Sequence, residues 1–302
     1  MTWDDEMAAA RRRLRRRLLF WRLLATGLAL ALVLVVLSRG GLIEREHVAR
    51  VSISGVLLED GERAAAIEAL GRDEAVRAVI VHIDSPGGTV VGGEQLYRAI
   101  RRVGEAKPVA VVMGTLAASG GYMAALGGER IFARDGTITG SIGVILQAVE
   151  VSALMERLGI HADTVRSGPL KGEPSPLAPL SDAGRAAIET VVNDMFAFFV
   201  DLVAERRAMP RERALALADG RIYTGRQAVA NGLVDELGDE RAAREWLARA
   251  HAIPAEMPVR DADVENDGDA VSHLLGSLVG KSLYSKALSL DGLVSVWHPR
   301  LR

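Results

Sequence analysis

The stretch Gly114-Thr115-Leu116-Ala117-Ala118-Ser119-Gly120-Gly121-Tyr122 is the part of the sequence from which the architecture can be inferred. It follows Pro108–Met113 (PVAVVM), an apolar run rich in β-branched residues that predicts a buried strand. It continues into Tyr122–Leu126 (YMAAL), which favours a helix. At such a turn, small neighbours leave a serine oxygen uncovered and the helix N-terminus brings backbone N–H groups nearby. Ser119 is therefore a candidate nucleophile, although its side chain could equally cap the helix.

The segments around this stretch alternate between strand-like and helix-like patterns. Apolar runs predict strands at 48–58, 77–84, 108–113, 129–133, 161–165 and 233–235. Helical spacing predicts helices at 62–70, 93–103, 151–158, 181–207, 211–218, 225–230 and 239–250. Repeated strand–turn–helix units predict an α/β fold with parallel strands and with its functional turns at one edge of the sheet.

The composition limits the classes of function. The chain has 302 residues, of which 49% are hydrophobic, enough for a sizeable core. Its net charge of -2 and its few aromatic residues argue against a nucleic-acid partner. It contains no cysteine, which excludes disulfides, thiolate catalysis and cysteine metal sites.

The N-terminal residues have the pattern of a membrane anchor. Arg11–Arg17 (RRRLRRR) precedes Leu23–Leu37, a run without a charge. Counted from Leu18, this run approaches the roughly 20 residues that span a bilayer, and the upstream arginines predict a cytoplasmic N-terminus. A cleaved signal peptide has the same layout, but no Ala-x-Ala site follows the run. We expect a cytoplasmic basic segment at 1–17, a transmembrane helix at 18–39 and a linker at 40–47.

The periodic patterns weaken after Pro254. Residues 260–270 are acidic, a composition typical of disorder. We therefore expect one catalytic domain over residues 48–253 and a partly disordered tail over residues 254–302.

Two further motifs could complete a site around Ser119. Ser85-Pro86-Gly87-Gly88 follows a predicted buried strand, and the N–H groups of adjacent glycines can form an oxyanion hole, although the motif also suits a tight turn. Lys171 lies in a loop and could act as general base if desolvation left it neutral. The chain carries most of its positive charge on arginine, which cannot take that role. Ser141, in Gly140-Ser141-Ile142-Gly143, could hold the lysine by a hydrogen bond or could simply belong to a β-bulge.

A Ser-His-Asp triad is the alternative to a lysine base. His82 lies within a predicted core strand and suits a structural role, and His161 begins a predicted strand at the edge opposite the functional turns. The other histidines lie beside the anchor or near the tail: His47, His251, His273 and His298. No histidine or carboxylate cluster in the sequence suggests a metal site, and no cofactor is implied.

Several motifs together resemble the signal peptide peptidase A (SppA) family, in its short, single-repeat bacterial form. The matching residues run in order from about 48 to 250: Asp84-Ser85-Pro86-Gly87-Gly88, Ala117-Ala118-Ser119-Gly120-Gly121-Tyr122, Gly140-Ser141-Ile142-Gly143-Val144, Ser167-Gly168-Pro169-Leu170-Lys171, Arg221-Ile222-Tyr223-Thr224-Gly225-Arg226-Gln227-Ala228 and Asn231-Gly232-Leu233-Val234-Asp235. The chain departs from the family at Gly172-Glu173-Pro174, where relatives often have Lys-Asp or a similar pair after the lysine.

The resemblance implies a ClpP/crotonase-like fold of stacked ββα units and a membrane-anchored serine endopeptidase that degrades remnant signal peptides. It implies Ser119 as nucleophile, Lys171 as general base and then acid, and Ser141 as the residue that orients the lysine. Backbone N–H groups at Gly87 or Gly88, with Gly120, would form the oxyanion hole. It also implies a ring-shaped homo-oligomer with active sites near subunit interfaces, and a catalytic domain outside the cytoplasmic membrane.

Three other functions are compatible with parts of this pattern. A related branch of membrane proteases cleaves stomatin-like proteins. A crotonase-like acyl-CoA enzyme would use a similar oxyanion hole on a thioester, but it would need neither the anchor nor both Ser119 and Lys171. A catalytically inactive membrane scaffold would tolerate Ser119→Ala, whereas a peptidase would not.

Overall fold

The computed structural model describes residues 17–31, 46–262 and 293–296, and the chain divides into two units, residues 1–45 and 46–302. In the first unit, the described residues form a helix over 17–31. No helix within the described ranges is long and apolar enough to cross a membrane. The predicted anchor extends to residue 39, so part of it lies outside the described residues, as do most of the predicted basic segment and linker.

The second unit alternates strands and helices, as the sequence predicts. In chain order, its elements are β1 (His47–Leu57), α2 (Gly61–Leu70), β2 (Val76–Thr89), α3 (Val90–Gly104), β3 (Val109–Ala118), α4 (Gly120–Ala125), β4 (Arg130–Ala133), β5 (Ile138–Gly140), β6 (Ile145–Leu146), α5 (Ser152–Arg157), α6 (Asp182–Arg206), α7 (Arg211–Leu217), β7 (Ile222–Thr224), α8 (Gly225–Asn231), β8 (Glu236–Leu237), α9 (Glu240–His251), β9 (Val259–Asp261) and β10 (Leu293–Val296).

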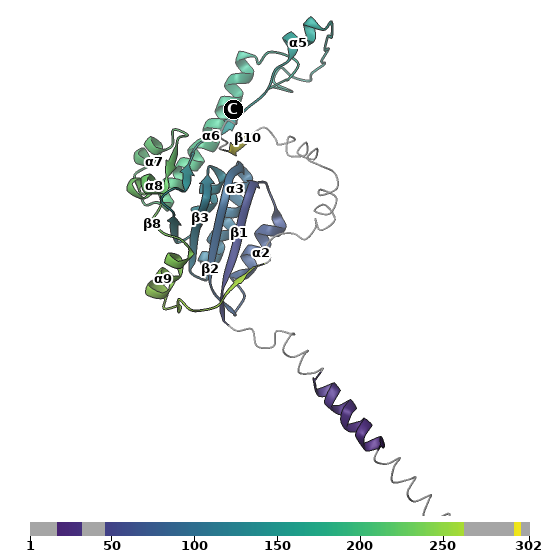
Figure 1. The fold of residues 1–302 in the computed structure, drawn as a ribbon. Coiled ribbons are helices and arrows are strands. Elements are labelled where there is room, and N and C mark those ends of the chain that lie inside the picture. The colour runs from purple at the N-terminus through teal and green to yellow at the C-terminus, as the bar shows by residue number, and fades with distance from the viewer. Residues whose placement is uncertain (1–16, 32–45, 263–292, 297–302) are drawn as a thin grey trace, which may run out of the picture. The chain divides into compact units, whose positions relative to one another are not determined.

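The strands form one mixed sheet that is covered on both faces (Figure 1). β1, β2, β3 and β4 are parallel neighbours, and β8 extends the parallel set beyond β4. Helices α2, α3 and α4 pack against one face, where Ile67, Ile100 and Met123 belong to one buried cluster. Helix α9 packs against the other face through Trp246 and Leu247. Burial on both faces explains why the strand sequences are continuous apolar runs.

Side-chain caps set the starts of the helices. Asp60 caps α2 by accepting from the N–H of Arg63, and Thr89 caps α3 in the same way. Ser181 caps α6 by accepting from the N–H of Gly184. These oxygens satisfy N–H groups that have no partner inside the helix.

The carboxyl end of β2 is where this strand changes its neighbour. β3 pairs with β2 as far as Ser85↔Ala117, and beyond this point β10 pairs antiparallel with residues 87–89. β1 lies on the opposite edge of β2, and β6 lies on the other side of β10. β10 therefore occupies the edge of β2 that β3 leaves just before the chain reaches Ser119.

Helix α6 and the segment before it project beyond the sheet. α6 has 25 residues, and Figure 1 shows α5 at the far end of the projection, away from the central strands. The segment between β6 and α6 exposes many large apolar side chains: Val149, Leu154, Leu158, Ile160, Val165, Leu170 and Leu177.

The structure differs from the sequence predictions at four places. Ser85–Gly88 continues β2 and is not a turn. Residues 161–165 form no strand, and Val165 is 97% exposed. The short strand predicted at 233–235 lies at β8 instead. β9 and β10, in the predicted tail, join the sheet by pairing with β1 and β2, whereas residues 263–292 and 297–302 lie outside the described ranges.

Candidate active site

Ser119 lies at the N-cap position of α4, directly after β3. Its backbone has φ 56° and ψ -121°, and the residue is 1% exposed. Its side chain makes no capping hydrogen bond to α4, so the N-cap interpretation has no support. A positive φ strains a non-glycine residue by about 1–3 kcal/mol, and such residues cluster at functional sites. The backbone of Ser119 thus favours the nucleophile interpretation.

The end of β2 lies against the start of α4. A Cβ built on Gly120 would be 3.2 Å from the nitrogen of Gly88 and 3.4 Å from the Cα of Gly87. The Gly87 N–H already donates to Ser85 Oγ at 3.0 Å, and this hydroxyl in turn donates to the Gly55 carbonyl at 2.7 Å. Of the three glycines considered for an oxyanion hole, Gly88 and Gly120 are therefore better placed than Gly87.

Ser141 directly follows β5, the strand that is hydrogen-bonded to the turn carrying Ser119 (the nucleophile turn). β5 pairs with β3 as far as Ala118↔Gly140, and the Ser119 N–H donates to the Gly140 carbonyl at 2.8 Å. Gly140 and Ser141 both have positive φ, 81° and 51°. The structure therefore brings Ser141, which is 9% exposed, next to the backbone of Ser119.

Two side chains fix the helix that Ser119 begins. The Tyr122 hydroxyl, on α4, donates to the Leu233 carbonyl at 2.8 Å, and burial raises the pKa of Tyr122 so that it stays a neutral donor. Arg206, at the end of α6, donates to the carbonyls of Leu126 and Gly128 at 2.8 and 3.0 Å. These carbonyls lie just beyond the C-terminus of α4, where a helix leaves acceptors without partners.

Lys171 lies outside this cluster. It belongs to the loop between α5 and α6, and its side chain is exposed. Its backbone N–H donates to the Gly168 carbonyl at 3.1 Å. Within the described residues, no hydrogen bond or ion pair involves its ammonium group. A single chain thus assembles Ser119, Ser141 and the glycines but not the predicted base.

A groove lies between β6 and α6. Its lining residues follow Ser141 and the Lys171 loop in the sequence. It has a volume of about 440 Å³. Apolar side chains line much of it: Val144, Ile145, Leu146, Ile188 and Val192. This groove could take an apolar side chain of a peptide bound in the position of β10.

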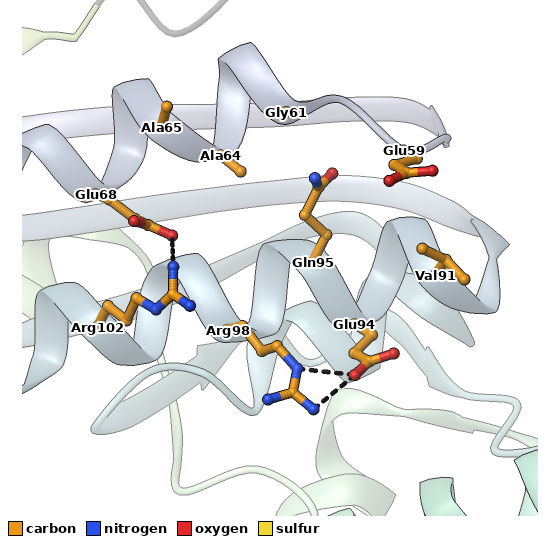
Figure 2. Close-up of a pocket in the computed structure, with 10 residues that line it drawn as sticks. All are labelled: Glu59, Gly61, Ala64, Ala65, Glu68, Val91, Glu94, Gln95, Arg98 and Arg102. Carbon is orange, nitrogen blue, oxygen red and sulfur yellow. Dashed lines mark hydrogen bonds and ion pairs between the residues drawn. The ribbon is translucent and has the colours of Figure 1, made fainter.

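A second groove lies between α2 and α3 (Figure 2). It has a volume of about 430 Å³, and none of the predicted site residues lines it. Four of its charged groups form two ion pairs, Glu68 with Arg102 and Glu94 with Arg98, and Glu59 also lines it.

His82 has the structural role that its place in a core strand predicts. Its Nε2 lies 2.9 Å from Glu240 Oε2, and the same carboxylate accepts two hydrogen bonds from Arg50. The Arg50 hydrogen bond, followed by the hydrogen bond to His82, lowers the pKa of Glu240 against the opposing effect of burial. This cluster ties β1 and β2 to α9.

Sequence reasoning misses two residues of the site region. The sequence assigns Ser85 to a turn, yet this serine is buried and bonded to Gly87; its place directly before Pro-Gly-Gly is the available signal. The sequence places Glu173 outside the chemistry, yet its side chain is 8% exposed and pairs with Arg166. Only the charge two positions after the lysine points to it.

Comparison with known proteins supports the resemblance seen in the motifs. Residues 101–253 match the model of Peptidase family S49. A Synechocystis protein named "Putative protease slr0021" is 36% identical over 234 residues, which cover 77% of this chain and 84% of the relative. An Enterococcus faecium protein named "Putative signal peptide peptidase SppA" is 32% identical over 271 residues, which cover 84% of this chain and 77% of the relative.

Among solved structures, a point mutant of ClpP1 from Listeria monocytogenes aligns with 64% of this chain and 92% of its own, at 19% identity and a TM-score of 0.42. The family match, at residues 101–253, includes both the turn that carries Ser119 and the Lys171 loop. The chain therefore belongs to peptidase family S49, the SppA family of serine peptidases.

Proposed function

We propose that this chain is a membrane-anchored serine endopeptidase that cleaves apolar peptides, remnant signal peptides among them, through a Ser119/Lys171 dyad. Membership of family S49 supports peptide hydrolysis. The name of the Enterococcus faecium relative supports signal peptides as substrates. The uncharged run at 23–37, behind seven residues of which six are arginine, supports an anchor with the catalytic domain outside the cytoplasmic membrane.

The position of β10 is the observation that carries this proposal. An extended segment bonds antiparallel to residues 87–89 on one side and to β6 on the other. It thus runs beside Gly87 and Gly88, on the edge of β2 that β3 leaves just before Ser119, and this edge is the proposed binding position of the scissile peptide. Strand addition supplies affinity through main-chain hydrogen bonds, and adjacent pockets supply side-chain preference. The apolar groove between β6 and α6 is such a pocket.

The chemistry follows from these positions. Ser119 Oγ attacks the scissile carbonyl while the neutral Lys171 amine takes its proton, and the N–H groups of Gly88 and Gly120 stabilise the oxyanion. The lysine then protonates the leaving amine, which leaves an acyl-serine. Lys171 next takes a proton from water, the hydroxide formed hydrolyses the ester, and the proton returns to Ser119.

We further propose that the lysine reaches Ser119 from a second copy of the chain in a ring. The Lys171 loop packs on the first turn of α6, where Glu173 lies beside Gly184, whereas Arg206, at the opposite end of this helix, holds α4. Gly184 and Arg206 are about 33 Å apart at the rise of an α-helix. The exposed apolar side chains around Lys171 give a second copy a surface to pack on.

Mixing inactive variants tests the proposal. The full chain, in detergent, is assayed on an apolar fluorogenic peptide beside Ser119→Ala and Lys171→Ala. Each variant alone should be inactive, and an equimolar mixture refolded together should recover about a quarter of the wild-type rate, because random assembly pairs an intact serine with an intact lysine at that frequency.

Each other outcome would change the assignment. A mixture with no activity would place the dyad within one chain. Full activity of Lys171→Ala would exclude the lysine as base. A wild-type protein that cleaves neither this peptide nor any other, while correctly assembled, would favour the scaffold.

A further inference from the structure

The loop that carries Lys171 has little regular structure to hold it. Its residues belong to no helix or strand, and Gly172, directly after the lysine, has φ 88°. A lysine side chain is long and flexible, so an imprecise backbone would spread the ammonium group over many positions. A base must come within hydrogen-bond reach of the hydroxyl that it deprotonates. Something must therefore fix this loop.

Glu173 forms hydrogen bonds with two residues that precede Lys171 in the loop. Its backbone N–H donates to the Leu170 carbonyl at 3.3 Å, and Lys171 makes a similar turn with Gly168. Its carboxylate accepts from Arg166 Nη1 at 3.3 Å, which joins the residues before and after the lysine. The side chain of Glu173 is 8% exposed and that of Arg166 is 23% exposed, so solvent screens this ion pair less than a surface pair.

The same carboxylate attaches the loop to α6. A Cβ built on Gly184 would be 3.0 Å from Glu173 Oε2 and 3.1 Å from Glu173 Cδ. The carboxylate thus fills the space left by the missing side chain, in the first turn of α6, where the helix dipole favours a negative charge. The Ser181 cap of the same turn supports this position.

Packing alone does not account for a carboxylate at this place. Glu173 Oε2 is buried and has no hydrogen-bond partner among the described residues, a cost that an apolar side chain of similar size would avoid. Apart from Lys171 and Glu173 itself, the loop from Arg166 to Glu173 carries no group suited to act as base.

We propose that Glu173 is a positioning residue for Lys171: by bridging Arg166 and the start of α6, it fixes the backbone from which the lysine reaches the nucleophile. This inference rests on the proposed function, since it assumes that Lys171 is the base. In this proposal Glu173 acts only through the lysine.

A double-mutant cycle with Lys171 tests this role. The full-length assembly is assayed on an activated ester, so that weak residual rates are measurable, with Glu173→Ala, Glu173→Gln and Gly184→Ala. We expect Glu173→Ala to lower kcat about ten- to hundredfold, as a displaced catalytic group does, with KM within about twofold. Glu173→Gln keeps the shape of the side chain without its charge, so its kcat should lie between those of Glu173→Ala and wild type. Glu68→Gln, which breaks the remote pair with Arg102, is the matched control and should change nothing.

The decisive comparison is Glu173→Ala added to Lys171→Ala. If Glu173 acts only through the lysine, the double variant is no slower than Lys171→Ala alone. An equal further loss in that background would overturn the proposal, because Glu173 would then act independently of the base. If Glu173→Ala fails to assemble, Glu173→Gln and Gly184→Ala give the same comparison. Full activity of Lys171→Ala would instead remove the proposed function, and a normal Glu173→Ala beside an inactive Lys171→Ala would remove this inference alone.

Discussion

Replacing Ser119 by glycine should give a more stable protein than replacing it by alanine, although both variants lose the proposed nucleophile. Both substitutions remove the hydroxyl, but alanine keeps the Cβ that strains a backbone at φ 56° and ψ -121°. Relief of that strain stabilises the folded state by about 1–3 kcal/mol. The greater freedom of glycine in the unfolded chain offsets about 0.5–1 kcal/mol of this.

Taking the middle of both ranges, the net difference is about 1 kcal/mol in favour of glycine. For a domain of this size, each kcal/mol corresponds to a shift in Tm of roughly 2–4 °C. The assay is thermal unfolding of Ser119→Gly and Ser119→Ala at one protein concentration, since assembly makes Tm depend on concentration. Ser52, in the extended strand β1, is the matched control, and there the glycine variant should be the less stable one.

Equal stability of the two Ser119 variants would refute the reasoning. The backbone at Ser119 would then be relaxed, and its conformation would no longer support a functional role. A glycine variant less stable than the alanine variant, as at Ser52, would refute it more strongly.

Three further outcomes follow from the geometry. Gly120→Ala places a Cβ 3.2 Å from the Gly88 nitrogen and should lower kcat about ten- to hundredfold with little change in Tm; an unchanged kcat would remove these two residues from the oxyanion hole. Glu240→Gln should destabilise the protein at pH 7, and the loss should vanish as the pH falls. The pKa of this carboxyl is lower in the folded protein than in the unfolded chain. Its contribution to stability is therefore complete above the unfolded pKa near 4.3 and is lost as the pH falls through the folded pKa. A loss of Tm that is equal at pH 7 and pH 3 would contradict this. Deleting residues 293–302, which removes β10, should lower KM for a long peptide and leave kcat within about twofold, because an intramolecular competitor is removed; a raised KM would mean that β10 helps to build the site.

The sequence predicts the central elements well because burial on both faces leaves an unmistakable pattern. β1, β2 and β3 are apolar runs, and the amphipathic α3 and capped α6 also lie where the sequence predicts them. Residues 161–165 have a strand-like pattern but find no partner, and one strand without a partner is not stable.

Contacts between distant parts of the chain decide what local patterns cannot. Ser85–Gly88 contains proline and two glycines, which predict a turn, but β1 and β10 pair with the end of β2 and keep it extended. A Cβ on Gly88 would come within 1.8 Å of the Leu57 carbonyl oxygen, so the glycine serves a close approach between strands. β10 is four residues long and depends wholly on such pairing.

The candidate site divides in the same way. Ser119 could be found from its small neighbours and its place between strand and helix. The hydrogen bond from Ser85 to the Gly55 carbonyl and the burial of Glu173 depend on tertiary contacts. The spacing of residues in the sequence does not reveal such contacts. The exposure of Lys171 depends on the whole fold. A sequence can indicate two candidate residues for a dyad without indicating how far apart a single chain holds them.

The placement of Lys171 and Ser119 near opposite ends of α6 has a consequence for when the enzyme is active. If the dyad is built from two chains, as proposed, a newly folded single chain is inactive until it assembles. Activity should then rise more steeply than in proportion to protein concentration at high dilution. The proposed membrane anchor would then favour activation, because confining the chains to a membrane surface raises their local concentration.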